Sequence, residues 1–389
     1  MSPSRHLALL AFAAVLLSAV TATATEFKMS RAEYYNPRFY GMGGAFSAIS
    51  NDRNLFFTNP AGVAYVDRNR IGFEFLPVQV NNNTFDVTNF FVDNRDTFED
   101  LENLPVEEQA EFYEKVLDEV GAKVSDLSAH LPIYLLLPSG SSSSRPHLAL
   151  GVFARGGSEF FTVNGASGIP LASLNLDAEV TGVLSAGYTW AELLPGPLTA
   201  AGSAKIDHRN ISANEKSLLA LSSDEKLDFL KGTVASLDLG LMYEVSPRVR
   251  LSAALFDVVS GDFEFSGQDQ RDSLDTLNEQ DIGKIETSLI LGAAYIADRP
   301  YRAFHDLMLA IDVREPFDAE KSFWRSIHIG AEAWLGPLAL RFGFFEGYPG
   351  GGFGIGPLQY AYYSNELGNF AGAKSNYTHA LSLAFSFGI

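Results

Sequence analysis

Apolar and polar residues alternate with a period of two along most of this chain. In segment 177–190, Ala, Val, Leu, Tyr and Trp hold most even positions, whereas acidic, hydroxyl and glycine residues hold most odd ones. Segments 233–245 and 377–389 repeat this pattern. Because successive side chains of a β-strand face opposite sides, the pattern predicts strands with one apolar and one polar face.

Alternating segments recur across the whole length after residue 68. We place them at 69–80, 131–137, 147–156, 177–190, 196–210, 233–245, 247–257, 284–296, 304–314, 325–335, 338–345, 351–356, 357–364 and 377–389. An even set of about fourteen strands is typical of bacterial barrels that span the outer membrane. The predicted fold class is therefore all-β, a transmembrane antiparallel β-barrel over residues 69–389.

The connections between these segments differ in length in a regular way. Every even-numbered connection is short; these are 138–146, 191–195, 246, 297–303, 336–337 and 356–357. Most odd-numbered connections are long, namely 81–130, 157–176, 211–232, 258–283 and 365–376. Outer-membrane barrels have short periplasmic turns and longer external loops, so this alternation favours a barrel over a soluble sandwich.

Two sets of side chains fit the two environments of such a wall. Aromatic residues near the predicted strand ends suit the girdles at the membrane interfaces; they are Tyr188, Trp190, Tyr243, Tyr295, Trp324, Trp334, Tyr360, Tyr362 and Tyr363. Charged residues on the polar faces are expected to point into the lumen; they are Asp177, Glu179, Asp238, Glu244, Glu286, Glu332 and Arg341.

Residues 93–129 break the alternation. Phe112, Val116 and Val120 recur at helical spacing among glutamates, after Pro105 and before Gly121. This spacing predicts an amphipathic acidic helix inserted in a loop. The helix either lies as a solvated cover over the barrel mouth, or it gates the pore or binds a protein partner.

The N-terminus indicates export. Arg5 precedes an uncharged apolar run, and Ala22-Thr23-Ala24 has the small-x-small form that signal peptidase cleaves. We expect residues 1–24 to be a signal peptide for the Sec pathway, cleaved near Ala24. The whole sequence is 47% hydrophobic, yet after the signal peptide it has no second apolar run long enough for a transmembrane helix. We therefore expect the protein to lie in the outer membrane, in contact with its lipid.

Charge and composition exclude several functions. A net charge of −19 leaves no basic patch for nucleic acid. The absence of cysteine removes disulfides, thiolate metal sites and cysteine nucleophiles. The seven histidines form no recognisable catalytic or metal motif, and the odd spacing of His379 and Ser382 puts them on opposite faces of a strand. We expect no enzyme activity, no cofactor and no metal.

Residues 25–68 precede the first strand and form a glycine-rich apolar segment. Its core is the run 41–46, Gly-Met-Gly-Gly-Ala-Phe, followed by 55–62, Leu-Phe-Phe-Thr-Asn-Pro-Ala-Gly. These runs resemble the N-terminal signature of the FadL-like long-chain fatty-acid transporter superfamily. The C-terminal residues Tyr348-Pro349, Gly354-Ile355-Gly356, Tyr360–Tyr363 and Glu366-Leu367-Gly368 resemble its PorV/TraF-like branch.

This resemblance implies that the N-terminal segment plugs the lumen and that hydrophobic cargo leaves sideways through the wall. Asn59, Pro60 and Ala61 would then be the plug motif. The apolar plug residues able to touch cargo would be Met42, Phe46, Ile49, Phe56 and Phe57; the alternative is that they simply pack the plug against the wall. The expected function is passive transport of hydrophobic compounds such as long-chain fatty acids. The alternative is an accessory of a secretion, conjugation or surface-protein attachment system, with a protein partner at the external loops.

Overall fold

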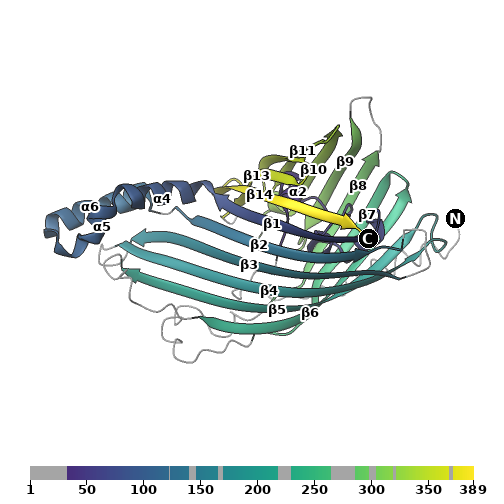
Figure 1. The fold of residues 1–389 in the computed structure, drawn as a ribbon, viewed down its shortest axis with the longest axis horizontal. Helices are drawn as coiled ribbons and strands as arrows, with labels where there is room; N and C mark the ends of the chain where they lie inside the picture. Colours follow the sequence, from purple (N-terminus) through teal and green to yellow (C-terminus); the bar gives the residue numbers. More distant parts are fainter. Residues whose placement is uncertain are drawn as a thin grey trace.

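The computed structural model describes residues 33–121, 123–139, 146–164, 170–217, 229–263, 285–297, 304–318, 321–367 and 371–389. Fourteen antiparallel strands form a closed barrel in which each strand pairs with its sequence neighbours and β1 (Arg70–Asn81) pairs with β14 (Ser375–Gly388) (Figure 1). Closure gives every strand a paired neighbour on both sides, which is the condition for a sheet to lie in lipid. The predicted fold class is confirmed. The signal peptide 1–24 and the first residues of segment 25–68 lie outside the described residues.

The remaining strands follow in chain order around the wall. They are β2 (Ser125–Leu137), β3 (His147–Asn164), β4 (Pro170–Trp190), β5 (Leu198–Ser217), β6 (Leu230–Ser246), β7 (Val249–Ser260), β8 (Ser288–Ala297), β9 (His305–Arg314), β10 (Ile327–Leu335), β11 (Leu338–Phe345), β12 (Tyr348–Ile355) and β13 (Leu358–Glu366). A short helix, α7 (Phe323–Ser326), precedes β10.

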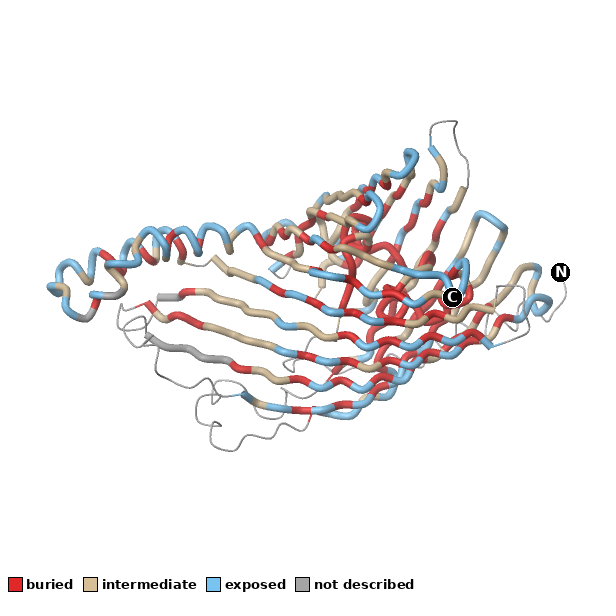
Figure 2. Tube along the Cα trace, in the orientation of Figure 1, coloured by how far each residue is buried: buried red, intermediate tan, exposed pale blue. Residues whose placement is uncertain are grey.

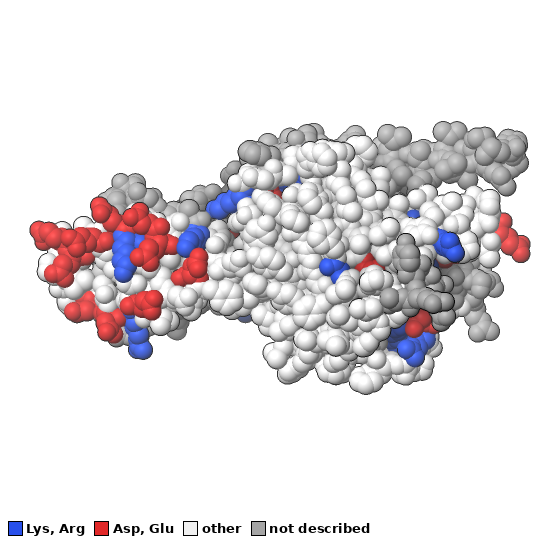
Figure 3. Space-filling model, turned by 90° about the horizontal axis from the view of Figure 1, so that it is seen from above, with Lys and Arg blue, Asp and Glu red and all other residues white. Residues whose placement is uncertain are grey.

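Side chains alternate between the lumen and the outer surface as the sequence predicts. On β6, Asp238 is buried whereas Leu237 and Leu239 are about half exposed, at 47% and 48%. Buried and exposed residues alternate in this way along most of the wall (Figure 2). Figure 3 shows a barrel face that is almost free of charge. The outer surface is therefore an apolar belt around a polar lining.

The predicted loop 157–176 is wrong because strands occupy most of it, and the predicted loop 211–232 begins too early because β5 runs into it. β3 and β4 stay paired to Asn164↔Pro170, within the predicted loop 157–176. β5 likewise continues to Ser217, where it pairs with Leu171. The wall formed by β3, β4 and β5 thus extends well beyond the short strands β8–β13 (Figure 1). The alternation of apolar and polar residues is weaker there, so the sequence pattern did not reveal these strand extensions.

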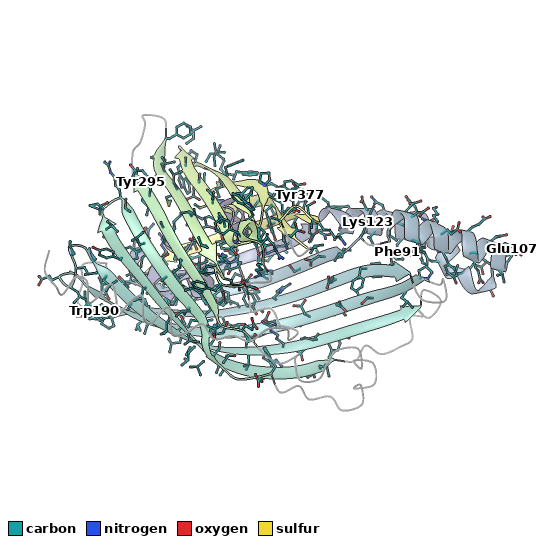
Figure 4. The ribbon with its side chains drawn as sticks, turned by 180° about the vertical axis from the view of Figure 1, so that it is seen from behind. Phe91, Glu107, Lys123, Trp190, Tyr295 and Tyr377 are labelled. Atoms are coloured by element: carbon teal, nitrogen blue, oxygen red, sulfur yellow. The ribbon has the colours of Figure 1, made fainter. Side chains whose placement is uncertain are left out.

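The helical insertion between β1 and β2 begins earlier and ends earlier than the predicted range 93–129. It contains α4 (Asn82–Asp93), α5 (Arg95–Glu99), the 3-10 turn η2 (Leu101–Asn103) and α6 (Val106–Glu119). These helices project from the mouth of the barrel, with Glu107 near their tip (Figures 1 and 4). The Asn81 side chain caps α4 by accepting from Thr84 N at 3.0 Å.

The projecting helices are held together by aromatic side chains. Phe98 packs edge-on against Phe112 with a centroid distance of 4.8 Å, and Phe91 meets Phe160 of β3 at 5.4 Å. This packing explains why α4 is helical although the sequence of residues 82–93 is poor in strong helix formers. Within the described residues, no helix is both long and apolar enough to cross a membrane.

Segment 33–68 lies inside the barrel as three short helices joined by turns. They are α2 (Pro37–Gly41), α3 (Leu55–Thr58) and the 3-10 helix η1 (Pro60–Tyr65). Most of its apolar side chains are buried, and the buried core in Figure 2 is concentrated where this segment meets the wall. We call residues 33–66 the plug.

Candidate functional site

The plug motif Asn59-Pro60-Ala61 is a helix cap seated against β6. The Asn59 side chain accepts from Ala61 N at 2.9 Å, which starts η1, and donates to Leu241 O at 3.0 Å. Pro60 occupies the first helical position, where no N–H is needed. A Cβ placed on Gly240 would lie 2.8 Å from the Pro60 ring, so this wall position accepts only glycine while the motif is seated.

A second seat holds the glycine run of the plug against β10 and β11. Gly43 has a φ of +60°, a conformation that favours glycine. A Cβ on Gly343 would lie 2.5 Å from Gly43 Cα, and one on Gly330 would lie 3.0 Å from Met42 C. Plug and wall therefore meet backbone to backbone, and a methyl group on any of these glycines separates them.

Charged side chains fix the plug on the same side of the barrel. Glu332 accepts from Arg38 Nη2 at 2.8 Å and from Arg341 Nε at 2.7 Å, and Arg38 also donates to Asp52 at 2.9 Å. Glu332 is fully buried, so its two arginines compensate its charge. The Arg38–Glu332 pair ties the plug to β10, and the Glu332–Arg341 pair links β10 to β11. Both wall residues lie in the lumen as predicted.

Two further buried ion contacts were not predicted from the sequence. Asp312 of β9 accepts from Phe46 N and Ser47 N, each at 2.9 Å. Arg53 pairs with Glu74 of β1 through two contacts, one of them 2.8 Å between Nη2 and Oε2. Glu74 and Asp312 are each a single charge in an apolar or alternating stretch, and such a charge is rarely buried without a partner. That rule was the signal available in the sequence.

The predicted cargo-contacting residues separate into two groups. Met42, Phe46 and Ile49 belong to the half of the plug that carries the glycine run, and Phe46 lies under the Arg38 guanidinium at 5.0 Å. Phe56 and Phe57 lie against Phe153 of β3, with centroid distances of 5.3 and 4.8 Å. All five are fully buried, so their side chains pack the plug in this state. Their contact with cargo stays a prediction.

The wall beside the second group is interrupted. Pairing between β1 and β2 stops at Phe73↔Ile133 and resumes at Val78↔Ala129, and the β1–β14 register also shifts between Phe75 and Val78. Leu76 has a φ of +49°, and the next residue, Pro77, has no N–H to donate. We call residues 74–77 of β1 the wall break.

An aromatic group lines the lumenal side of the wall break. Tyr34 packs against Phe57 at 5.2 Å, Phe153 at 5.5 Å and His130 of β2 at 5.9 Å. On the outer side of the same break, Phe75 and Leu131 are each more than half exposed. At the wall break, therefore, a single strand layer lies between the aromatic interior and the apolar outer surface.

Other predicted positions have mixed outcomes. Glu179 and Asp238 are buried in the lumen as expected, whereas Glu286 lies before β8 rather than within it. Trp190 and Tyr295 lie toward one end of the barrel and Tyr377 toward the other (Figure 4). Tyr363 is not part of a girdle, because it points into the lumen and stacks on Tyr40 of the plug at 4.0 Å. The alternation of side-chain directions along β13 could have predicted the lumenal position of Tyr363.

The described residues give no support for catalytic chemistry. Ser382 is buried, whereas His379 lies on the opposite face of the strand. The His379 Nδ1 is hydrogen-bonded to the Tyr360 hydroxyl at 2.8 Å. No group of three or more His, Asp or Glu side chains within the described ranges is placed to hold a metal ion.

Comparison with known proteins supports the fold. No family model and no curated protein matches the sequence. Among solved structures, the chain is similar to the Ralstonia pickettii toluene transporter TbuX, with 13% identity, a TM-score of 0.50, and coverage of 92% of this chain and 99% of that chain. A TodX mutant described as a monoaromatic hydrocarbon channel has 11% identity, a TM-score of 0.49, and coverage of 90% and 98%. At such identities the likeness to TbuX concerns the fold alone.

Proposed function

We propose that this protein is an outer-membrane channel through which hydrophobic compounds cross passively, with the plug as its gate. The main observation behind this proposal is that aromatic side chains of the plug and of β3 lie directly behind the wall break. The apolar outer belt and the fold shared with TbuX support it. Membership of the FadL-like superfamily and export through the Sec pathway are part of the same proposal.

The cargo leaves the lumen sideways between β1 and β2. An apolar molecule that passes the aromatic group of Tyr34, Phe57 and Phe153 reaches lipid through the wall break without crossing the polar lining. The plug controls this path because Arg53 of the plug holds Glu74, the first residue of the break. Aromatic hydrocarbons and long-chain fatty acids are both candidate cargoes.

Uptake by Gram-negative cells tests the proposed function. Cells that make the protein should take up labelled toluene or oleate faster than cells that make an unrelated barrel of similar size. Equal rates for every apolar compound tested would exclude the transport function.

Crosslinking tests the exit. The chain has no cysteine, so two engineered thiols react without competition. A short bis-maleimide that joins Phe75→Cys to Leu131→Cys should abolish protein-dependent uptake. The matched control joins Ile71→Cys to Leu135→Cys, which face each other in the intact ladder, and should leave uptake unchanged. Full uptake through the crosslinked break would place the exit elsewhere.

A second candidate, an accessory role in a secretion, conjugation or attachment system of the PorV/TraF type, is favoured by the projecting helices. Acidic side chains gather on them (Figure 3), and Phe85, Val92 and Val106 are exposed there. Deletion of residues 82–124 separates the two functions. If the protein is a channel, uptake of apolar compounds should persist after the deletion. If it is an accessory protein, the deletion should abolish partner binding, and neither the parent nor the deletion variant should support uptake.

A further inference from the structure

The plug side chain Tyr34 fills a site that the barrel wall and the plug form together. Its ring packs against Phe153 of β3 at 5.5 Å, His130 of β2 at 5.9 Å and Phe57 of the plug at 5.2 Å. Its hydroxyl lies 3.0 Å from Thr181 Oγ1 of β4, and the whole residue is buried. We call these four surrounding residues the Tyr34 site. Its space is that of one phenol, because it already holds one.

The hydrogen bond at the polar end of this site has a fixed direction. Thr181 has one hydroxyl hydrogen, and its Oγ1 donates it to Asp207 Oδ1 at 3.1 Å. The other oxygen of Asp207 accepts from Arg209 Nε at 3.0 Å, so this carboxylate acts as an acceptor on both sides. Thr181 Oγ1 must therefore accept from the Tyr34 hydroxyl. The site thus selects an aromatic ring that carries a hydrogen-bond donor, which a phenol has and a hydrocarbon lacks.

Tyr34 is also connected to the wall break. It lies in the stretch before α2 and belongs to no helix or strand. Its backbone oxygen accepts from Arg53 Nη1, and the same guanidinium pairs with Glu74, the first residue of the break. A molecule that displaces Tyr34 therefore acts on the residue that holds the plug to the break.

We propose that Tyr34 is an internal stand-in for cargo, and that the Tyr34 site receives a phenol when the tyrosine side chain leaves it. The inference rests on the proposed transport function and narrows its substrate class to aromatic compounds with a hydroxyl group. The ring of the phenol takes the place of the Tyr34 ring against Phe153, and its hydroxyl donates to Thr181. Tyr34 is tethered beside the site, so it competes with free phenol at a high effective concentration.

Removal of the competing side chain tests the site. The probes are p-cresol, which is a tyrosine side chain without its backbone, and p-xylene, which has the same shape without the hydroxyl. Isothermal calorimetry measures both on the full-length protein in a non-ionic detergent. Tyr34→Ala should bind p-cresol at least about tenfold more tightly than the parent, because the site is no longer occupied. Unchanged p-cresol affinity, with the barrel folded by heat-modifiable gel mobility, would overturn the proposal.

A second substitution tests the hydrogen bond. Adding Thr181→Val to Tyr34→Ala should lower the ratio of p-cresol affinity to p-xylene affinity about three- to tenfold, the net contribution of one hydrogen bond. Ser185→Ala in the same background is the matched control. Ser185 is a buried hydroxyl on the same face of β4, but it lies 2.6 Å from Ser203 Oγ of the wall, so its removal should keep the ratio. The same ratio with and without the Thr181 hydroxyl would disprove the assignment.

A milder pair of variants leaves the plug filled. Tyr34→Phe loses only the bond to Thr181 and should raise the affinity for p-cresol about three- to tenfold over the parent. Tyr35→Phe loses a bond within the plug, to Phe57 O at 3.0 Å, and should not change it. No gain in Tyr34→Phe would contradict the competition between Tyr34 and cargo. Toluene uptake without any p-cresol binding would refute only this inference, whereas absent uptake of every compound would refute the channel itself.

Discussion

The backbone contact between plug and wall predicts that one methyl group undocks the plug. In Gly343→Ala, the new Cβ would meet Gly43 Cα at 2.5 Å and the Gly43 nitrogen more closely still. Neither atom belongs to a flexible side chain, and Gly43 is fixed by its positive φ and by the contacts on both sides. The plug must therefore move away from β11.

The size of the effect follows from the cost of overpacking. Forcing an extra methyl group into a packed site costs about 1–3 kcal/mol. If the barrel stays closed, this cost falls on plug docking alone, and the undocked population rises about 5- to 150-fold. Gly330→Ala acts on Met42 of the same plug turn and should have an effect of the same order.

Thiol labelling measures this population directly. Ala48 is fully buried in the docked plug, and Ala48→Cys provides the only thiol in the chain. A membrane-impermeant maleimide reacts with it only when the plug opens, so the labelling rate follows the open population. Gly343→Ala should raise that rate by the factor given above.

Gly156→Ala on β3 is the matched control, because a Cβ there meets no atom within 4 Å. It should label at the rate of the parent. Equal rates in Gly343→Ala and Gly156→Ala, with both barrels folded by heat-modifiable gel mobility, would show that the plug does not rest on β11 as described.

Three other predictions concern the wall and the plug as a whole. Leu239→Arg on the outer belt should destabilise the barrel in urea titrations by about 2–4 kcal/mol, whereas Thr233→Arg farther along β6 should cost less; equal losses would contradict the assignment of the belt. Glu332→Gln leaves the buried Arg341 and the largely buried Arg38 without their shared counter-charge and should cost about 3–5 kcal/mol in the same titrations, against no measurable change for the exposed Asp306→Asn. Deletion of residues 33–66 should raise ion conductance in planar bilayers, and unchanged conductance would mean that the plug does not close the lumen.

The amino-acid pattern alone predicted the barrel, its strand number and the face of most strand residues. A period of two is a local property, and lipid on one side demands apolar side chains at every second position, so the chain records its environment directly. The same alternation assigned Asp238 and Leu239 to opposite faces. At residues 157–164 and 170–176 the alternation is weaker, and the loop predicted there was wrong.

The contacts that hold the plug and the position of the wall break depend on residues that are brought together in the folded barrel. The partners Arg53 and Glu74 are close in sequence, but nothing local requires them to meet across the barrel interior. The contact of Gly43 with Gly330 and Gly343 depends on closure of the sheet, which brings β10 and β11 to the plug from almost three hundred residues away. Likewise, the carboxylates of Asp238 and Asp257 share Lys205 because the register of β6 and β7 shifts between Leu237↔Val259 and Leu239↔Leu255. Pairings of this kind depend on register and closure, which the alternation of side chains does not encode.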